Sequence, residues 1–156
     1  MHIPRIYIDT SVIGGCFDEE FQEWSNKLFN EFVGSKKKAI ISDVVYEELY
    51  GSPYNVQDKI NEIPIENLEK LDKTSESEFL ADKYIEFKVI SEKYYDDALH
   101  IALATINNVD VLVSWNFKHI VNYDRIMKYN SVNLMFGYKA LEIRNPKEVL
   151  LNEKDF

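Results

Sequence analysis

The chain has 156 residues, of which 46% are hydrophobic and 13% aromatic, and its formal net charge is −9. This length suits one domain with a substantial core, so we expect a single domain over residues 1–156, and the composition excludes a disordered polymer. No apolar run is long enough to cross a bilayer, and the negative charge argues against broad adhesion to DNA or acidic membranes, because Lys and Arg dominate contacts with phosphate.

The first predicted element is a buried strand over residues 3–8, which is rich in Ile and Tyr. Asp9, Thr10 and Ser11 follow it as a turn, and the glycine pair at 14–15 lets the backbone bend tightly. The chain enters this strand without the apolar stretch and the cleavage site of a secretory signal, which predicts a cytoplasmic protein.

A helix over residues 21–32 and a second buried strand over 39–41 come next. The helix that follows the second strand carries Glu48 about two turns from its start. Residues 56–92 mix charged and apolar side chains in the pattern of amphipathic helices on an outer face. Within them, residues 63–65 and 68–71 supply either one short strand or an extended connection, and the pattern does not decide between the two.

The C-terminal half continues the alternation of helices and strands. Asp97 opens an apolar helix over residues 98–106, and a short buried strand covers 111–113. Asn116 follows that strand and leads into a helix that extends to about Tyr129.

The last segments are predicted to be a strand over 132–135, an edge strand over 141–143 and a short helix that begins at Pro146. Strands that alternate with helices predict an α/β fold, in which a parallel sheet is sandwiched by helices on both faces. Right-handed crossovers then place the C-terminal end of every strand at the same side of the sheet, where ligands bind in such folds.

This topology would bring Asp9, Glu48, Asp97 and Asn116 to one crevice. Carboxylates that lie close together repel one another strongly unless a divalent cation lies between them. Hard cations take oxygen ligands, so Mg²⁺ or Mn²⁺ is the expected cofactor, held by Asp9, Glu48 and Asp97. Such an ion activates a water and neutralises charge on phosphate, which predicts phosphodiester hydrolysis, with Asn116 orienting water or completing the metal shell.

Each acidic residue also has a simpler explanation. Asp9 is suited to organising a turn, Asp97 to capping a helix and Glu48 to facing solvent. Their convergence at one edge of the predicted sheet favours the functional interpretation of the set. Thr10 or Ser11 is expected to hydrogen-bond a ligand carboxylate at this edge.

Lys118 is the cation expected to position the substrate, by contact with phosphate. The neighbouring His119 is left out of the catalytic set, because a single histidine near an apolar stretch is more often structural. The chain has three scattered histidines and one cysteine, Cys16, with no zinc-type spacing among them. A bound metal would therefore be held by oxygen.

Four segments of the chain resemble those of PIN-domain ribonucleases, in particular the VapC-like toxins of bacterial and archaeal toxin–antitoxin modules. They occur in order from Ile6 to about Ile120 and read YIDTSV around Asp9, YEELYG around Glu48, DALHIALA from Asp97 and LVSWNFKHI around Asn116.

The resemblance implies a PIN-like fold and a metal-dependent endoribonuclease with Asp9, Glu48 and Asp97 at its metal site. Asn116 falls where many members have a further aspartate, which reduces the charge of the site. The resemblance also implies an RNA substrate, a homodimer and a small antitoxin protein whose peptide blocks the crevice.

Two functions are therefore compatible with the sequence. The first is a Mg²⁺- or Mn²⁺-dependent endoribonuclease that acts as the toxin of a toxin–antitoxin module. The alternative, which Asn116 favours, is a non-catalytic PIN-like module that binds RNA or protein and retains a degenerate metal site.

Overall fold

The computed structural model of the chain describes residues 2–151 and contains one five-stranded sheet in the order β3-β2-β1-β4-β5. All four neighbouring pairs of strands are parallel, which confirms the predicted α/β fold class. In chain order, the strands are β1 (Arg5–Ile8), β2 (Lys38–Ser42), β3 (Leu68–Leu71), β4 (Val111–Val113) and β5 (Ile143–Arg144).

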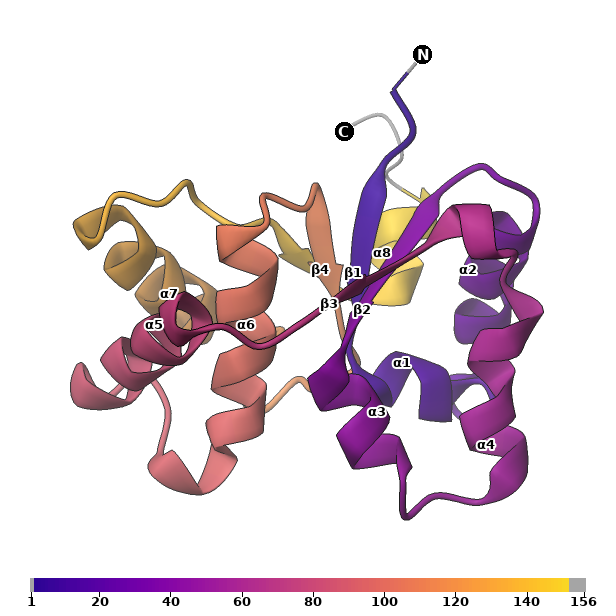
Figure 1. Cartoon of the computed structure of the whole chain (residues 1–156), viewed down its shortest axis with the longest axis horizontal. Helices are drawn as coiled ribbons and strands as arrows, with labels where there is room; N and C mark the ends of the chain where they lie inside the picture. The colour runs from indigo at the N-terminus through magenta and orange to yellow at the C-terminus, as the bar shows by residue number, and fades with distance from the viewer. Residues whose placement is uncertain (1, 152–156) are drawn as a thin grey trace.

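Helices cover both faces of the sheet, with α5, α6 and α7 on one face and α1, α2, α4 and α8 on the other (Figure 1). The eight α-helices within residues 2–151 are α1 (Thr10–Gly15), α2 (Gln22–Val33), α3 (Asp43–Leu49), α4 (Tyr54–Asp58), α5 (Ser75–Glu86), α6 (Tyr95–Ile106), α7 (Tyr123–Met135) and α8 (Pro146–Leu151). Short 3₁₀ turns are η1 (Lys59–Glu62), η2 (Ile65–Asn67) and η3 (Glu92–Tyr94). Over this described range, no helix has the length and apolar character needed to cross a membrane.

The central strands bury side chains on both faces. Tyr7, Ile40 and Leu112 join the hydrophobic cluster that includes α5, α6 and α7. Their neighbours Ile6 and Ile41 point the other way, into the cluster that includes α1, α2 and α8. Side chains alternate between the faces of a strand, so burial of both faces produces the continuous apolar runs seen in the sequence. Each fully buried Ile or Leu side chain among them contributes roughly 1.5–3 kcal/mol of hydrophobic free energy.

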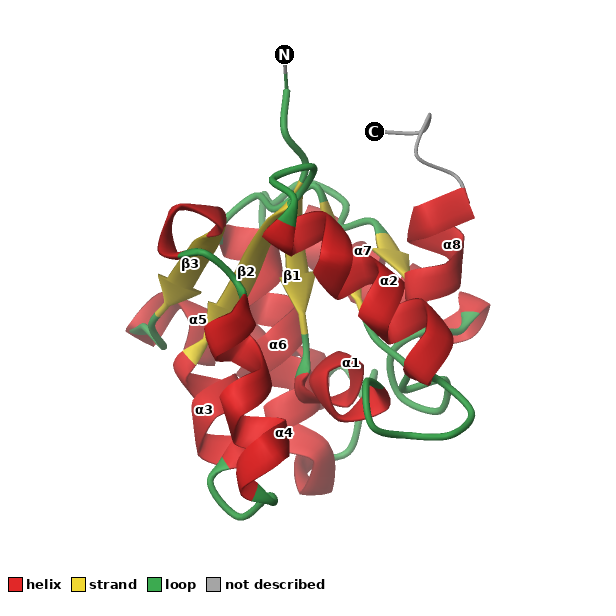
Figure 2. Cartoon of the chain, turned by 90° about the vertical axis from the view of Figure 1, so that its right-hand side faces the viewer, coloured by secondary structure: helices red, strands yellow, loops and turns green. Residues whose placement is uncertain are grey.

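The carboxyl ends of β1 and β2 lie at the same side of the molecule (Figure 2), and β4, which pairs with β1 in parallel, ends at that side as well. β1 continues through Asp9 into α1, β2 ends at Ser42 where α3 begins, and β4 is followed by Ser114. The parallel arrangement therefore gathers the segments that carry the predicted site residues.

Helix α1 replaces the turn predicted after the first strand, so that prediction is wrong. The carboxylate of Asp9 accepts a hydrogen bond from the backbone N–H of Val12 and thereby caps this helix. Two glycines in six residues give the segment a low helix propensity, but Gly15 packs closely against Ser25 and Trp115. Tertiary packing has outweighed local propensity here.

The strand predicted over residues 132–135 is also wrong, because these residues form the end of α7. The side chain of Asn122 caps this helix by accepting a hydrogen bond from the backbone N–H of Arg125. Tyr129 and Val132 lie on its buried face, at the spacing of three residues that a helix requires. The apolar residues of this segment therefore follow helical and not strand periodicity.

The other predicted boundaries are closer to those of the structure. The helix expected from Asn116 begins at Tyr123, because residues 117–120 form a turn before it. Residues 68–71, where the sequence left two possibilities open, form β3 at one edge of the sheet. The predicted edge strand is β5 at the opposite edge, and α8 begins at Pro146 as predicted.

Candidate active site

Asp9 lies at the carboxyl end of β1 and is only 4% exposed. Its two carboxylate oxygens accept hydrogen bonds from Ser11 Oγ and Ser114 Oγ, each at 2.6 Å. Burial raises the pKa of Asp9 above its usual value, although the charge of His100 and the two serine hydrogen bonds oppose the rise. The carboxylate is therefore held in one orientation with little solvent to stabilise its charge.

Glu48 approaches Asp9 from α3, and its side chain is 29% exposed. Oε1 of Glu48 accepts hydrogen bonds from Thr10 Oγ1 at 2.8 Å and from His100 Nε2 at 2.6 Å. Burial alone would raise the pKa of Glu48, but the hydrogen bond and the positive charge of His100 bring it below its usual value. Glu48 is therefore ionised at neutral pH and fixed by residues of two other helices, α1 and α6.

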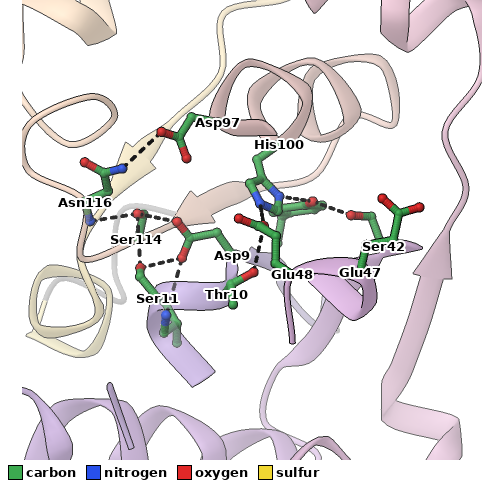
Figure 3. Close-up of polar contacts among 12 residues, drawn as sticks. Asp9, Thr10, Ser11, Ser42, Glu47, Glu48, Asp97, His100, Ser114 and Asn116 are labelled. Carbon is green, nitrogen blue, oxygen red and sulfur yellow. Dashed lines mark hydrogen bonds and ion pairs between the residues drawn. The ribbon is translucent and has the colours of Figure 1, made fainter. Parts of the chain in front are cut away.

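Asp97 belongs to the first turn of α6, and Figure 3 shows its carboxylate above that of Asp9, with the carboxylate of Glu48 to the side of both. Burial is the main cause that raises the pKa of Asp97 to about 6, and the charges of Asp9 and Glu48 raise it further against the opposing charge of His100. Asp9 and Glu48 thus both act on the ionisation of Asp97, which places the carboxylate of Asp97 in the same electrostatic environment as theirs.

Asn116 follows β4 and donates a hydrogen bond of 3.3 Å from Nδ2 to Asp97 Oδ2. Its own Oδ1 accepts a hydrogen bond from the backbone N–H of His119, so the amide oxygen is engaged within its loop. Lys118 is exposed in the turn that follows Asn116. Thus Asp9, Glu48, Asp97 and Asn116 lie together at the side of the sheet where the central strands have their carboxyl ends. Lys118 is exposed two residues beyond Asn116 in the sequence.

A cavity of about 310 Å³ lies beside these carboxylates. Its walls include Glu48 and Asp97 together with Lys93, Tyr94, Tyr95 and Asp96. The cavity carries acidic, cationic and aromatic groups, so it has the chemistry needed to admit a polar ligand next to the site.

Sequence reasoning missed His100 and Ser114, which hold two of the carboxylates. His100 comes three residues after Asp97 in the same helix, so the two side chains share a helix face. That spacing was a usable signal, since a histidine within the otherwise apolar run of residues 98–104 needs polar partners. Ser114 directly follows a buried strand, as Asp9 does. This equivalent position after a strand was the signal that could have identified Ser114.

The donor atoms of the site are chemically suited to a hard cation, because carboxylate and amide oxygens are the ligands that Mg²⁺ and Mn²⁺ prefer. The side chains themselves are paired with hydrogen-bond donors, Glu48 with His100 and Asp97 with Asn116. Across residues 2–151, no group of three or more His, Cys, Asp and Glu side chains is arranged to hold a metal ion. Metal binding by these residues stays a prediction.

The fold and the cluster of Asp9, Glu48 and Asp97 define an α/β protein with an acidic site at the carboxyl ends of parallel strands. The family model of the PIN domain matches residues 6–121, and the chain belongs to the PIN domain family. PIN domains are typically nucleases and typically depend on a metal.

Two solved structures are similar to this chain. VapBC2 from Rickettsia felis, crystallised bound to a DNA fragment from their promoter, is 19% identical with a TM-score of 0.56, over 90% of this chain and 98% of that chain. VapC20 from Mycobacterium tuberculosis, a Sarcin-Ricin loop cleaving toxin, is 13% identical with a TM-score of 0.50, over 73% of this chain and 92% of that chain. At these identities the likeness is one of fold. A comparison with curated proteins gives no match.

Proposed function

We propose that the protein is a Mg²⁺- or Mn²⁺-dependent endoribonuclease and the toxin of a toxin–antitoxin module. One observation carries the proposal: Asp9, Glu48 and Asp97 come from three separate segments, yet they lie together at the carboxyl ends of the central strands, where the charges of Asp9 and Glu48 raise the pKa of Asp97. Bringing carboxylates together in a partly buried site costs free energy, and such clusters with shifted pKa values occur preferentially at functional sites. Membership of the PIN domain family supports this assignment.

In this proposal Asp9, Glu48 and Asp97 hold the cation, which when bound supplies an activated water and neutralises charge on the phosphate. Ser11 and Ser114 keep Asp9 oriented through their hydrogen bonds. Thr10 does the same for Glu48. These contacts preorganise the acidic groups, so that little reorganisation is needed when substrate binds.

Two further residues act on the RNA side of the proposed site. Asn116 is a catalytic residue that orients water or completes the metal shell, and its hydrogen bond to Asp97 supports a place beside the metal. Lys118 is exposed near the loop of Asn116 and is suited to binding the phosphate backbone as a point charge. A chain with a net charge of −9 needs such local cations to attract RNA.

The proposed partners are an RNA substrate, a small antitoxin protein and a second copy of this chain in a homodimer. Similarity in fold to VapBC2, a toxin–antitoxin complex, supports the antitoxin. We further propose that residues 1–156 form a single domain and that the protein acts in the cytoplasm.

The alternative is a non-catalytic PIN-like module that binds RNA or protein. Asn116 favours it, because an amide at this position lowers the negative charge of the site, and its Nδ2 donates to Asp97 in the place where a cation would bind. Such a module would recognise its partner without cleaving it.

Metal-dependent cleavage of RNA separates the two functions. We expect the purified protein to cut single-stranded or structured RNA internally in the presence of Mn²⁺, to lose this activity in EDTA and to regain it with excess Mn²⁺. Glu48→Gln should lower the rate roughly 100-fold or more, because it removes a charged ligand. The measurement is product formation from end-labelled RNA, resolved on a sequencing gel.

Glu47→Gln is the matched control, because Glu47 precedes Glu48 in α3, is 60% exposed and pairs with Lys73. It should cleave RNA at nearly the wild-type rate. A folded wild-type protein that cuts no RNA in a broad pool at millimolar Mn²⁺, yet retains RNA or protein binding, would favour the non-catalytic module.

A further inference from the structure

His100 is a buried histidine whose two ring nitrogens are both engaged. The residue is only 1% exposed, and its neighbours in α6 are apolar and buried. Nε2 lies 2.6 Å from Glu48 Oε1, and Nδ1 lies 2.6 Å from the hydroxyl of Tyr7, which is itself 2.7 Å from Ser42 Oγ. A chain of hydrogen bonds therefore runs from β2 through β1 and α6 to the carboxylate on α3.

The direction of these bonds follows from their chemistry. An ionised carboxylate can only accept, so Nε2 of His100 must carry a hydrogen and donate it to Glu48. In the neutral ring Nδ1 then accepts from the Tyr7 hydroxyl, which accepts in turn from Ser42. In the protonated ring Nδ1 donates to Tyr7, which donates to Ser42. Either way His100 donates to Glu48, so its hold on the carboxylate does not depend on the charge of the ring.

The two oxygens of Glu48 have different surroundings. Oε1 accepts from both His100 and Thr10, and Figure 3 shows the carboxylate between these two donors. Among the contacts of residues 2–151, none is a hydrogen bond to Oε2. Two donors on one oxygen fix the rotation of the carboxylate and leave the other oxygen free to bind a ligand.

We propose that His100, anchored by Tyr7, is a positioning residue that orients Glu48 so that Oε2 is the oxygen available to a divalent cation. This inference rests on the proposed function, because it assigns a role within the same metal site. Groups that hydrogen-bond a metal ligand commonly change metal affinity by about 10- to 100-fold when they are removed. His100 would act in this way through Glu48, without contacting the metal or the RNA.

The test is the affinity of the full chain for Mn²⁺ alone, measured by isothermal titration calorimetry. His100→Leu removes the donor, and Tyr7 retains Ser42 as its partner, so we expect Kd to rise about 10- to 100-fold. His100→Gln carries an amide N–H that can reach Glu48, so it should recover most of the affinity. Tyr7→Phe leaves the imidazole of His100 in place but removes the hydroxyl that anchors its Nδ1. The Kd of this variant should lie between those of wild type and His100→Leu.

Ile101→Val is the matched control for a purely structural role. Ile101 is the next residue of α6 and is fully buried, and it belongs to the hydrophobic core. The Ile101→Val substitution should lower the unfolding temperature without changing the Kd for Mn²⁺. Should His100→Leu be unfolded, His100→Gln and Tyr7→Phe carry the comparison.

Three results overturn the inference in distinguishable ways. In the first, folded His100→Leu binds Mn²⁺ with the wild-type Kd while Asp97→Asn does not bind it. This result removes the role of His100 but leaves the proposed metal site intact. Equal losses in His100→Gln and His100→Leu, with Tyr7→Phe unchanged, also overturn it, because the donated hydrogen bond would then not matter. No Mn²⁺ binding by the wild-type protein would overturn both this inference and the proposed metal-dependent function.

Discussion

Replacing Asp97 by asparagine should lower metal-stimulated RNA cleavage by roughly 100- to 1000-fold. The change preserves the size of the side chain and the oxygen that accepts from Asn116 Nδ2, but it removes the negative charge. Asp97 shares its environment with Asp9 and Glu48, so the loss of its charge should weaken cation binding directly. The measurement is the single-turnover cleavage rate at saturating Mn²⁺, with wild type and variant purified in parallel to exclude contaminating nuclease.

Stability measurements distinguish this loss of charge from misfolding. The pKa of Asp97 is raised from 3.8 to about 6, so the folded state binds this proton more tightly than the unfolded state does. The contribution of Asp97 to the free energy of unfolding therefore falls as the pH rises from about 4 to about 6, and it stays low above that range.

Asp97→Asn removes this unfavourable charge. Without metal, the variant should therefore be more stable than wild type at pH 7 by about 1–2 kcal/mol, and nearly equal to it at pH 4. Urea unfolding at the two pH values measures the difference. A variant that is inactive but less stable at pH 7 would point to misfolding, and a fully active one would remove Asp97 from the mechanism.

Gly15→Ala should be the most destabilising small substitution near the site, with a cost of roughly 1–3 kcal/mol. A Cβ at this position would lie 2.6 Å from Ser25 Oγ and 2.8 Å from Trp115 Nε1. Neither neighbour can move freely, because Trp115 donates to Ser25 at 2.8 Å and stacks on Phe21 with a centroid distance of 4.3 Å. Displacement of Trp115 would also shift Asn116, so RNA cleavage should fall together with stability.

Gly14→Ala provides a matched control in the same helix. A Cβ at Gly14 meets no atom within 4 Å, and alanine favours a helix over glycine by about 1 kcal/mol. Gly14→Ala should therefore be as stable as wild type or slightly more stable in urea unfolding, with normal cleavage. Equal stability of Gly15→Ala and wild type would show that the close packing of α1 against Trp115 is dispensable.

Much of the fold was predictable because both faces of the central strands are buried. Residues 39–41 and 111–113 are short apolar runs, and such runs between helical segments indicate a parallel sheet. The two errors, at α1 and at the end of α7, have different causes. At α1 the structure depends on the packing of Gly15 against Trp115, which sequence periodicity does not reveal. At the end of α7 the helical spacing of Tyr129 and Val132 was present in the sequence, but the short apolar run was interpreted as a strand.

The convergence of the site residues was predictable for a topological reason. Asp9 and Asn116 follow adjacent parallel strands, so they reach the same edge whatever their separation in the sequence. The hydrogen bonds that hold them were not predictable. His100 looks like an isolated histidine in an apolar helix until the fold brings Tyr7 and Glu48 to its two nitrogens.

Anomalous diffraction from crystals grown with Mn²⁺ tests most directly whether this edge of the sheet binds a hard cation. We expect a manganese peak bounded by Asp9, Glu48 and Asp97, with Asn116 beside it. The Asp97→Asn variant, crystallised in the same way, should have a much weaker peak. A manganese peak confined to another surface, or an empty site at millimolar Mn²⁺ in a crystal that diffracts well, would contradict the proposal.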